Sequence, residues 1–184
     1  WQCIETADID GNNTMDLIAG NIGLNHPWQL RAGQSIDLYT ADFDQNTSPE
    51  CLISYPVQDK IYSFFSKDEL TAQMVGLRKK YTDYNSFAQS TFKEIFSAFD
   101  LSRDHKKIIQ LQTGVFYNQG KSSFTFSPLP PSCQSSIIFS CLAIDLNKDG
   151  QNDLMLGGNL YETLPSFGRF DASYGHTLIN EHGA

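Results

Sequence analysis

The sequence has few basic residues, no long apolar run and no closely spaced cysteine pair. Its 13 Lys and Arg residues stand against 21 Asp and Glu residues, which gives a formal net charge of −8 at pH 7. An acidic chain without a basic cluster lacks the electrostatic footprint of a nucleic-acid-binding protein. No apolar run approaches the roughly 20 residues that a transmembrane helix needs. The sequence therefore predicts neither a nucleic-acid partner nor a transmembrane segment.

The four cysteines show no CxxC spacing, which argues against a zinc site. Cys3 and Cys51 fall in apparent strands, where we interpret them as small buried hydrophobic residues. Cys133 and Cys141 flank the start of another strand, and a disulfide between these two is an open alternative. Cysteine usage alone does not fix the compartment.

What the sequence does contain is one acidic loop that occurs three times, at residues 8–16, 42–50 and 145–153 (loops 1, 2 and 3). Oxygen-bearing side chains occupy relative positions 1, 3, 5 and 9, and an apolar run follows. Ca²⁺ takes roughly six to eight oxygen ligands at about 2.3–2.6 Å, including a backbone carbonyl at position 7 in loops of this kind. The predicted metal ligands are Asp8, Asp10, Asn12, Thr14 and Asp16 in loop 1, Asp42, Asp44, Asn46, Ser48 and Glu50 in loop 2, and Asp145, Asn147, Asp149, Gln151 and Asp153 in loop 3.

The three loops differ at position 6, where the chain must turn sharply. Gly150 stands there in loop 3, whereas loops 1 and 2 have Asn13 and Thr47. Asn tolerates a left-handed backbone well and a β-branched Thr does so poorly. Loop 2 also carries Glu50 instead of Asp at position 9. We therefore expect loop 2 to bind calcium more weakly.

An EF-hand begins with a similar loop but requires a bidentate Glu at position 12 and flanking helices. Position 12 is Ala19, Ile53 or Leu156, each inside an apolar run, so we reject this alternative. Three copies of strand, acidic loop and strand instead indicate an internal repeat. Nine of the 21 acidic residues lie in the loops, so metal sites explain much of the negative charge.

The remaining sequence alternates as expected for short strands, with one exception near residues 66–100. Ser66 and Glu69 form a capping-box pattern, and apolar residues then recur at helical spacing as far as Tyr81. A second helix is predicted from Asp83 to about Phe99. We expect this helical insertion to pack its aromatic residues against the parent domain; a partner-docking surface is the alternative.

Several segments resemble the FG-GAP/VCBS repeat proteins, whose repeats build β-propellers like that of integrin α subunits. The matching segments are Ala7-Asp-Ile-Asp-Gly11, Leu17-Ile-Ala-Gly-Asn21, Leu38-Tyr-Thr-Ala-Asp-Phe-Asp44, Gly157-Gly-Asn159 and Gly168-Arg-Phe-Asp-Ala-Ser-Tyr-Gly175. The likeness covers nearly the whole chain and extends to the large secreted VCBS-repeat proteins of Bacteroidetes-like bacteria.

The resemblance implies an all-β fold in which residues 1–184 form a partial β-propeller of about three to four blades, with calcium-binding loops and the helical insertion. Propellers usually need about four to eight blades, so we expect neighbouring sequence or another chain to complete the ring. The start at Trp1, inside an apparent strand and without an initiator Met, fits a fragment or a processed product.

Two classes of function follow from these patterns. The first is a non-enzymatic module, stabilised by structural calcium, that binds a protein or glycan at the cell surface. The alternative is a propeller-based carbohydrate-active enzyme. We favour the first because the four histidines show no triad or ligand spacing and no acidic pair outside the loops resembles glycosidase carboxylates. Arg169, Asp171, Tyr174 and Trp28 are candidate ligand contacts, although loop fixing and packing explain them as well.

The expected location is extracellular or at the cell surface, including export to a bacterial outer membrane or periplasm. Weak calcium sites are saturated where calcium is millimolar, as it is outside cells. The resemblance also raises the hypothesis that the chain works within a larger outer-membrane or surface complex, such as a nutrient importer.

Overall fold

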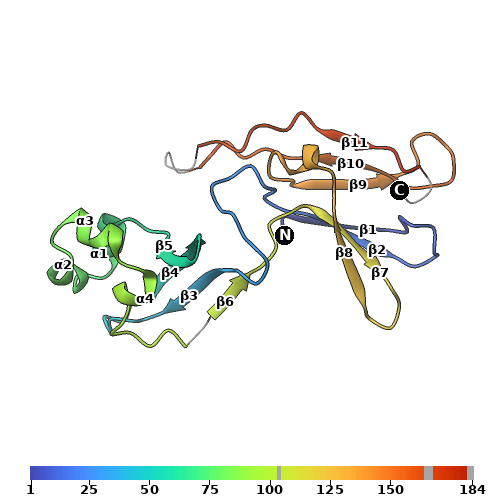
Figure 1. The fold of residues 1–184 in the computed structure, drawn as a ribbon. Coiled ribbons are helices and arrows are strands. Elements are labelled where there is room, and N and C mark those ends of the chain that lie inside the picture. Colours follow the sequence, from blue (N-terminus) through green and yellow to red (C-terminus); the bar gives the residue numbers. More distant parts are fainter. Residues whose placement is uncertain (103–104, 164–167, 182–184) are drawn as a thin grey trace. The chain divides into compact units, whose positions relative to one another are not determined.

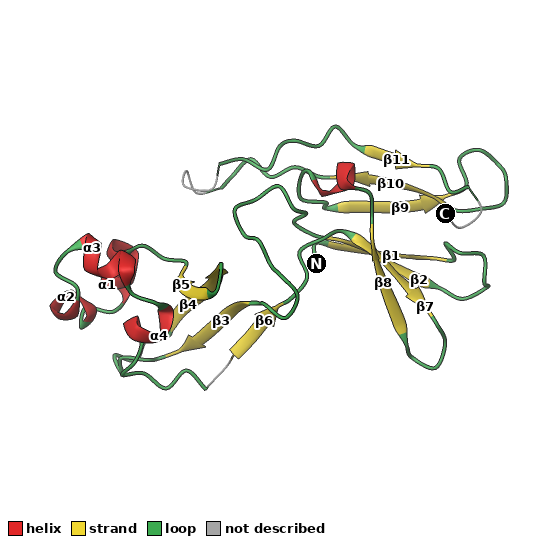
Figure 2. Cartoon of the chain, in the orientation of Figure 1, coloured by secondary structure: helices red, strands yellow, loops and turns green. Residues whose placement is uncertain are grey.

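A computed structural model describes residues 1–102, 105–163 and 168–181, which form three antiparallel sheets and four short α-helices (Figures 1 and 2). The chain is mostly sheet, as expected. It divides into two compact units: unit 1 contains Trp1–Pro27 and Gln110–Ala184, and unit 2 contains Trp28–Ile109. Unit 2 therefore interrupts unit 1 in the sequence.

Unit 1 contains two sheets. Sheet 1 has the strand order β1 (Cys3–Ala7), β2 (Asp16–Gly20), β7 (Gly114–Asn118) and β8 (Phe124–Pro128). Sheet 3 has the order β11 (His176–Leu178), β10 (Asp153–Gly157) and β9 (Ser140–Ile144). Ile18 of β2 pairs with Val115 of β7, so sheet 1 joins segments from both sides of unit 2.

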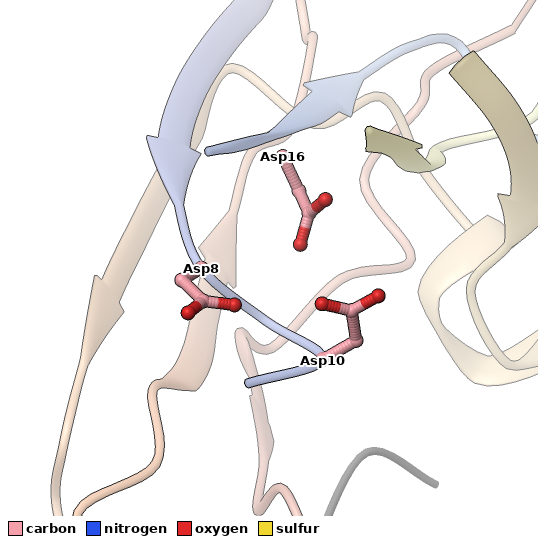
Figure 3. Close-up of side chains that lie close together, drawn as sticks. All are labelled: Asp8, Asp10 and Asp16. Carbon is pink, nitrogen blue, oxygen red and sulfur yellow. The ribbon is translucent and has the colours of Figure 1, made fainter. Parts of the chain in front are cut away.

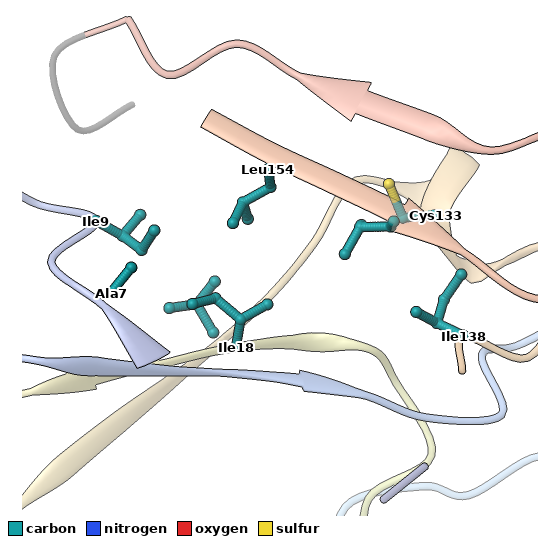
Figure 4. Close-up of a cluster of buried hydrophobic side chains, with 8 residues drawn as sticks. Ala7, Ile9, Ile18, Cys133, Ile138 and Leu154 are labelled. Atoms are coloured by element: carbon teal, nitrogen blue, oxygen red, sulfur yellow. The ribbon is translucent and has the colours of Figure 1, made fainter. Parts of the chain in front are cut away.

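The core of unit 1 is an apolar cluster to which both sheets contribute (Figure 4). Its buried members are Ala7, Ile9, Ile18, Val115, Cys133, Ile138, Leu154 and Leu156. In β10, Leu154 and Leu156 are buried while Met155 between them is exposed, because successive strand residues point to opposite faces. Each fully buried Ile or Leu contributes about 1.5–3 kcal/mol to folding.

A short segment beside this core requires glycine. At Gly158 an added Cβ would lie 2.4 Å from the carbonyl oxygen of Ile137 and 2.5 Å from the amide nitrogen of Phe139, whereas the preceding Gly157 faces open space. The next residue, Asn159, accepts hydrogen bonds from the Ser136 hydroxyl and the Ser173 amide through one oxygen. The Gly-Gly-Asn segment therefore anchors the chain that leads to β11.

Unit 2 packs its helices on one sheet. Sheet 2 has the order β5 (Lys60–Ser63), β4 (Glu50–Val57), β3 (Ile36–Ala41) and β6 (His105–Ile108). Leu52 of β4 is fully buried with Leu70, Met74, Leu77, Tyr81, Phe92, Ile95 and Phe96 from the helical segment. The apolar helical residues thus pack against the unit that carries them, as expected.

The sequence predicted two helices at residues 66–100, and the structure has four shorter ones: α1 (Lys67–Gln73), α2 (Leu77–Lys80), α3 (Tyr84–Gln89) and α4 (Phe92–Ile95). Ser66 and Glu69 form the predicted capping box. A second capping box of Thr91 with Glu94 starts α4 and divides the second predicted helix, because such side chains offer the backbone an alternative to a continuing helix. Within the described residues, no helix has the length and apolarity to cross a membrane.

Candidate metal centres

Loop 1 brings three carboxylates together at the end of a strand pair. Ala7 pairs with Asp16 across β1 and β2, so the residues between them form a closed loop. Asp8, Asp10 and Asp16 each place a carboxylate oxygen within 4.8 Å of the other two, and the three groups turn toward a common space (Figure 3). Position 9 is the first residue of β2, so this group links both strands.

Backbone amides hold the carboxylates in a pattern that all three loops repeat. In loop 1, the amide at position 2 donates to the carboxylate at position 9, and the amides at positions 5 and 6 donate to the carboxylate at position 1. The amide at position 7 donates to the side-chain oxygen at position 5. Loops 2 and 3 show the same bonds, at 2.8–3.2 Å. The three loops therefore share one pattern of backbone hydrogen bonds.

Each loop has two residues in the left-handed region. Position 6, at which the sequence called for glycine, has φ of 61° at Asn13, 72° at Thr47 and 88° at Gly150. Position 4 was not predicted and has φ of 74° at Gly11, 61° at Gln45 and 66° at Lys148. A left-handed conformation costs a non-glycine residue roughly 1–2 kcal/mol. Loop 2 is the only one of the three without glycine at either position.

The carboxylate at position 9 is fully buried in the two loops of unit 1. Asp16 and Asp153 have no exposed surface. Besides the amide at position 2, each accepts a second backbone amide at 2.8 Å, from Asn118 for Asp16 and from Asn180 for Asp153. Asn118 is the last residue of β7, and Asn180 follows two residues after the end of β11. Each lies two residues beyond the strand residue that pairs with position 10 of its loop. Sequence spacing did not identify either asparagine. The chain of the third strand therefore holds the position-9 carboxylate through a backbone hydrogen bond.

In loop 2 the described residues show no such hydrogen bond from a third strand. Glu50 is buried and accepts the Phe43 amide at 2.8 Å. The third strand of the hairpin, β5, pairs Ser63 with Ser54 and the chain then turns into α1, and within the described part of the chain no amide of that strand donates to the glutamate. Asp42, Asp44 and Glu50 still place carboxylate oxygens within 4.8 Å of one another.

Loop 3 gathers its carboxylates less closely. Asp145, Asp149 and Asp153 do not meet the distance at which loops 1 and 2 converge. Here Asn147 occupies position 3, and its amide nitrogen donates to Asp149 at 2.8 Å. The structure thus groups three predicted carboxylates in each of two loops, while loop 3 retains the backbone pattern and has its amide at position 3 instead of position 5.

Loops 1 and 3 lie beside each other at one end of unit 1. The Asn152 side chain donates to the carbonyl of Asp8 at 3.0 Å. The Asn180 side chain donates to the carbonyl of Ile9 at 2.7 Å. Sheets 1 and 3 therefore carry their acidic loops at the same edge.

The donor chemistry fits a hard cation. All side-chain donors at positions 1, 3, 5 and 9 are carboxylate or amide oxygens, and among the described residues no His nitrogen or Cys sulfur joins either carboxylate group. Ca²⁺ and Mg²⁺ take such oxygen sets, whereas Zn²⁺ sites use mainly His and Cys. In loops 1 and 2 the three carboxylates of a single loop lie close enough together to hold an ion.

Other residues considered from the sequence have structural partners. The ring of Trp28 lies 5.6 Å from that of Phe64, which is a packing contact. His26 lies in a loop and is buried, with its Nε2 2.9 Å from the carbonyl of Gly23, and burial lowers the pKa of this imidazole. His105 pairs with Asp37 at 2.9 Å across β3 and β6. Tyr174 is fully exposed.

One cysteine expectation is wrong, and the sulfur contacts differ from the alternative considered for Cys133 and Cys141. Cys51 was expected to be buried and is exposed, because its side chain lies on the outer face of β4. Cys133 is fully buried beside Ser132, and the sulfur near Cys141 belongs instead to Cys3. The meeting of two sheets from distant parts of the sequence, which spacing does not reveal, decides this arrangement.

Unit 1 also contains an open cleft of about 1050 Å³. Its apolar lining includes Val115, Tyr117, Leu129, Leu154 and Leu178. Among the described residues no acidic or histidine side chain lines it. This cleft therefore supplies none of the paired carboxylates that a glycosidase uses.

Comparison of the chain with protein-family models, with curated proteins and with solved structures gave no match. The site is therefore interpreted from its own geometry.

Proposed function

We propose that this protein is a calcium-stabilised β-propeller module that binds a protein or glycan outside the cell, without catalysis. The observation that carries the proposal is the repeated loop in which backbone amides fix carboxylates around one point. Two of the loops bring three carboxylates within 4.8 Å. Such a group needs a counter-charge, because like charges at this separation repel one another.

The proposed role of the ion is structural. Its ligands come from one loop that joins two strands, and position 9 belongs to the second strand. A bound Ca²⁺ would supply the positive charge that draws the loop oxygens together. An ion that binds only the folded state stabilises that state by about 2.7 kcal/mol per site at 100 times its dissociation constant.

The propeller assignment is supported by the arrangement of unit 1. Sheets 1 and 3 share one apolar core and carry their loops at one edge, as adjacent blades would. The other face of sheet 3 exposes Leu142, Ile144 and Met155, each by more than 40%. Leu142 and Met155 are paired across β9 and β10. An apolar sheet face of this kind suits a further blade.

Binding is favoured over catalysis by the character of the cleft, which is largely apolar and, among the described residues, has no acidic or histidine side chain in its lining. Ligand pockets are typically apolar with a few polar groups that fix orientation. The carbohydrate-active enzyme remains the second candidate through the family resemblance. Weak calcium sites need millimolar calcium to be filled. We therefore propose that the protein acts at the cell surface or after export to a bacterial outer membrane or periplasm. A role within a larger complex there is part of the same proposal.

Calorimetric titration with Ca²⁺ tests the metal sites. We expect Asp10→Ala to remove the site of loop 1 and Asp44→Ala that of loop 2, each lowering the number of bound ions by about one. Asp59→Ala is the matched control, because Asp59 is an exposed acidic residue outside the loops. Absence of binding at millimolar Ca²⁺ in the unmodified protein would refute the metal sites. Release of reducing ends from a polysaccharide panel would instead favour the enzyme.

A further inference from the structure

Two cysteine sulfurs lie next to each other at the contact between the sheets of unit 1. The Sγ atoms of Cys3 in β1 and Cys141 in β9 are 2.9 Å apart, although 138 positions separate the residues in the sequence. The two strands belong to different sheets, so no ladder of sheet hydrogen bonds joins them. Both side chains are half-buried and pack against the core.

The surroundings leave room for this sulfur pair. Cys3 is opposite Gly20 in the β1–β2 pairing. A Cβ added at Gly20 would lie 2.5 Å from the Cys3 Sγ and 2.6 Å from the carbonyl oxygen of Ile138. Any other residue at this position would therefore displace the Cys3 sulfur or the neighbouring chain. The glycine allows β1 to approach the segment that leads into β9.

We propose that Cys3 and Cys141 form a disulfide that ties sheet 1 to sheet 3. Disulfide sulfurs are about 2.05 Å apart, so bond formation requires them to approach by about another 0.9 Å. The inference is independent of the metal sites. It concerns a covalent modification of the fold and holds whether or not calcium binds.

The oxidant is a small disulfide such as oxidised glutathione, or an oxidoreductase that carries one. One cysteine thiolate attacks the oxidant, forms a mixed disulfide and releases one glutathione thiolate. The second cysteine then attacks the protein sulfur, breaks the mixed disulfide and releases the second glutathione. The two protein thiols lose two electrons and two protons, and the oxidant is reduced to two thiols.

The exchange is expected to be slow. Burial, followed by the hydrogen bond with Cys3, raises the pKa of the Cys141 thiol well above its usual range. The thiolate is the reacting form, so little of it is present at neutral pH. Once formed, the bond closes a loop that contains all of unit 2, and long closed loops give the largest stabilisation in the chain-entropy model.

The test is incubation of the full chain with a glutathione redox series, followed by alkylation and peptide mapping. Chymotrypsin can cleave after Phe139, which lies between Cys133 and Cys141 and so separates their peptides. We expect one crosslinked product that contains Cys3 and Cys141, and a rise in melting temperature on oxidation on the order of 10 °C. Cys3→Ser and Cys141→Ser should each abolish both. Cys51→Ser, an exposed control in unit 2, should leave both unchanged.

Complete alkylation of both Cys3 and Cys141 in fully oxidising buffer would overturn the proposal, as would crosslinks that involve Cys133 or Cys51. A crosslink that leaves the melting temperature unchanged would refute the stabilising role. Folding of the serine variants is checked by their reduced melting temperature, which should match that of the reduced parent protein. If Cys3→Ser fails to fold, Cys141→Ala provides the same comparison.

Discussion

Replacing Asp16 by Ala separates the structural role of the position-9 carboxylate from its role as a metal ligand. Asp16 is completely buried and accepts backbone amides from Ile9 at 2.9 Å and Asn118 at 2.8 Å. Its removal leaves both amides without an acceptor, and each such loss costs about 1–3 kcal/mol. We therefore expect Asp16→Ala to lower the free energy of unfolding by about 2–6 kcal/mol even without calcium.

Asp10→Ala is the matched control in the same loop. Asp10 is exposed, and its bonds to Asn12 can be replaced by water. In EGTA we expect this change to alter stability by less than about 0.5 kcal/mol. In millimolar Ca²⁺ both variants should lose the calcium-dependent stabilisation of loop 1.

The assay is urea unfolding of the parent and both variants, in EGTA and in Ca²⁺, with the slope of the transition checked for two-state behaviour. Equal destabilisation by the two substitutions in EGTA would refute the distinction between a buried structural carboxylate and an exposed ligand. A cost below about 0.5 kcal/mol for Asp16→Ala would show that the two amides do not depend on this side chain.

Three further changes test local features, each by urea unfolding. Thr47→Gly in loop 2 should stabilise unit 2 by about 1 kcal/mol, since φ is 72° at a β-branched residue; a loss of stability would contradict the strain argument. Gly158→Ala should cost about 1–3 kcal/mol, because its Cβ would lie 2.4 Å from a carbonyl oxygen, whereas Gly157→Ala should change little; equal effects would exclude the close approach as the cause. Hydrogen bonds from the Ser66 hydroxyl, which has the larger effect, and from the Ser66 amide lower the pKa of Glu69. The ionised Glu69 therefore contributes to the stability of unit 2 above its unfolded-state pKa, and this contribution is lost as pH falls through its folded-state pKa. Glu69→Ala should therefore destabilise unit 2 at neutral pH and have no effect near pH 3, and an effect of equal size at both would refute the capping role.

The loops were predictable because their signal is local. Asp8, Asp10 and Asp16 stand at fixed spacing within nine residues, and a tight turn that brings their side chains together follows from that spacing. Position 4 was missed because Gln45 and Lys148 carry no sign of a left-handed backbone, which the closure of the loop imposes on them. The capping box at Ser66 was likewise local and was predicted correctly.

The features that could not be predicted from the sequence depend on strands that are distant in the chain. Asn118 and Asn180 donate to the buried carboxylates only because β7 and β11 are third strands of their sheets. The proximity of Cys3 to Cys141 depends in the same way on two sheets meeting. The division of the helical segment at Thr91 was visible in principle, since Thr91 and Glu94 repeat the pattern of a capping box.

Thermal unfolding of the protein in millimolar Ca²⁺ and then in EGTA, together with metal analysis, tests the central claim most directly. We predict that calcium raises the melting temperature by roughly 5–10 °C for each site filled to 100 times its dissociation constant, with about one ion bound per filled loop. An unchanged melting temperature and no bound metal would contradict the account, because the three loops would then be acidic turns held by backbone amides alone.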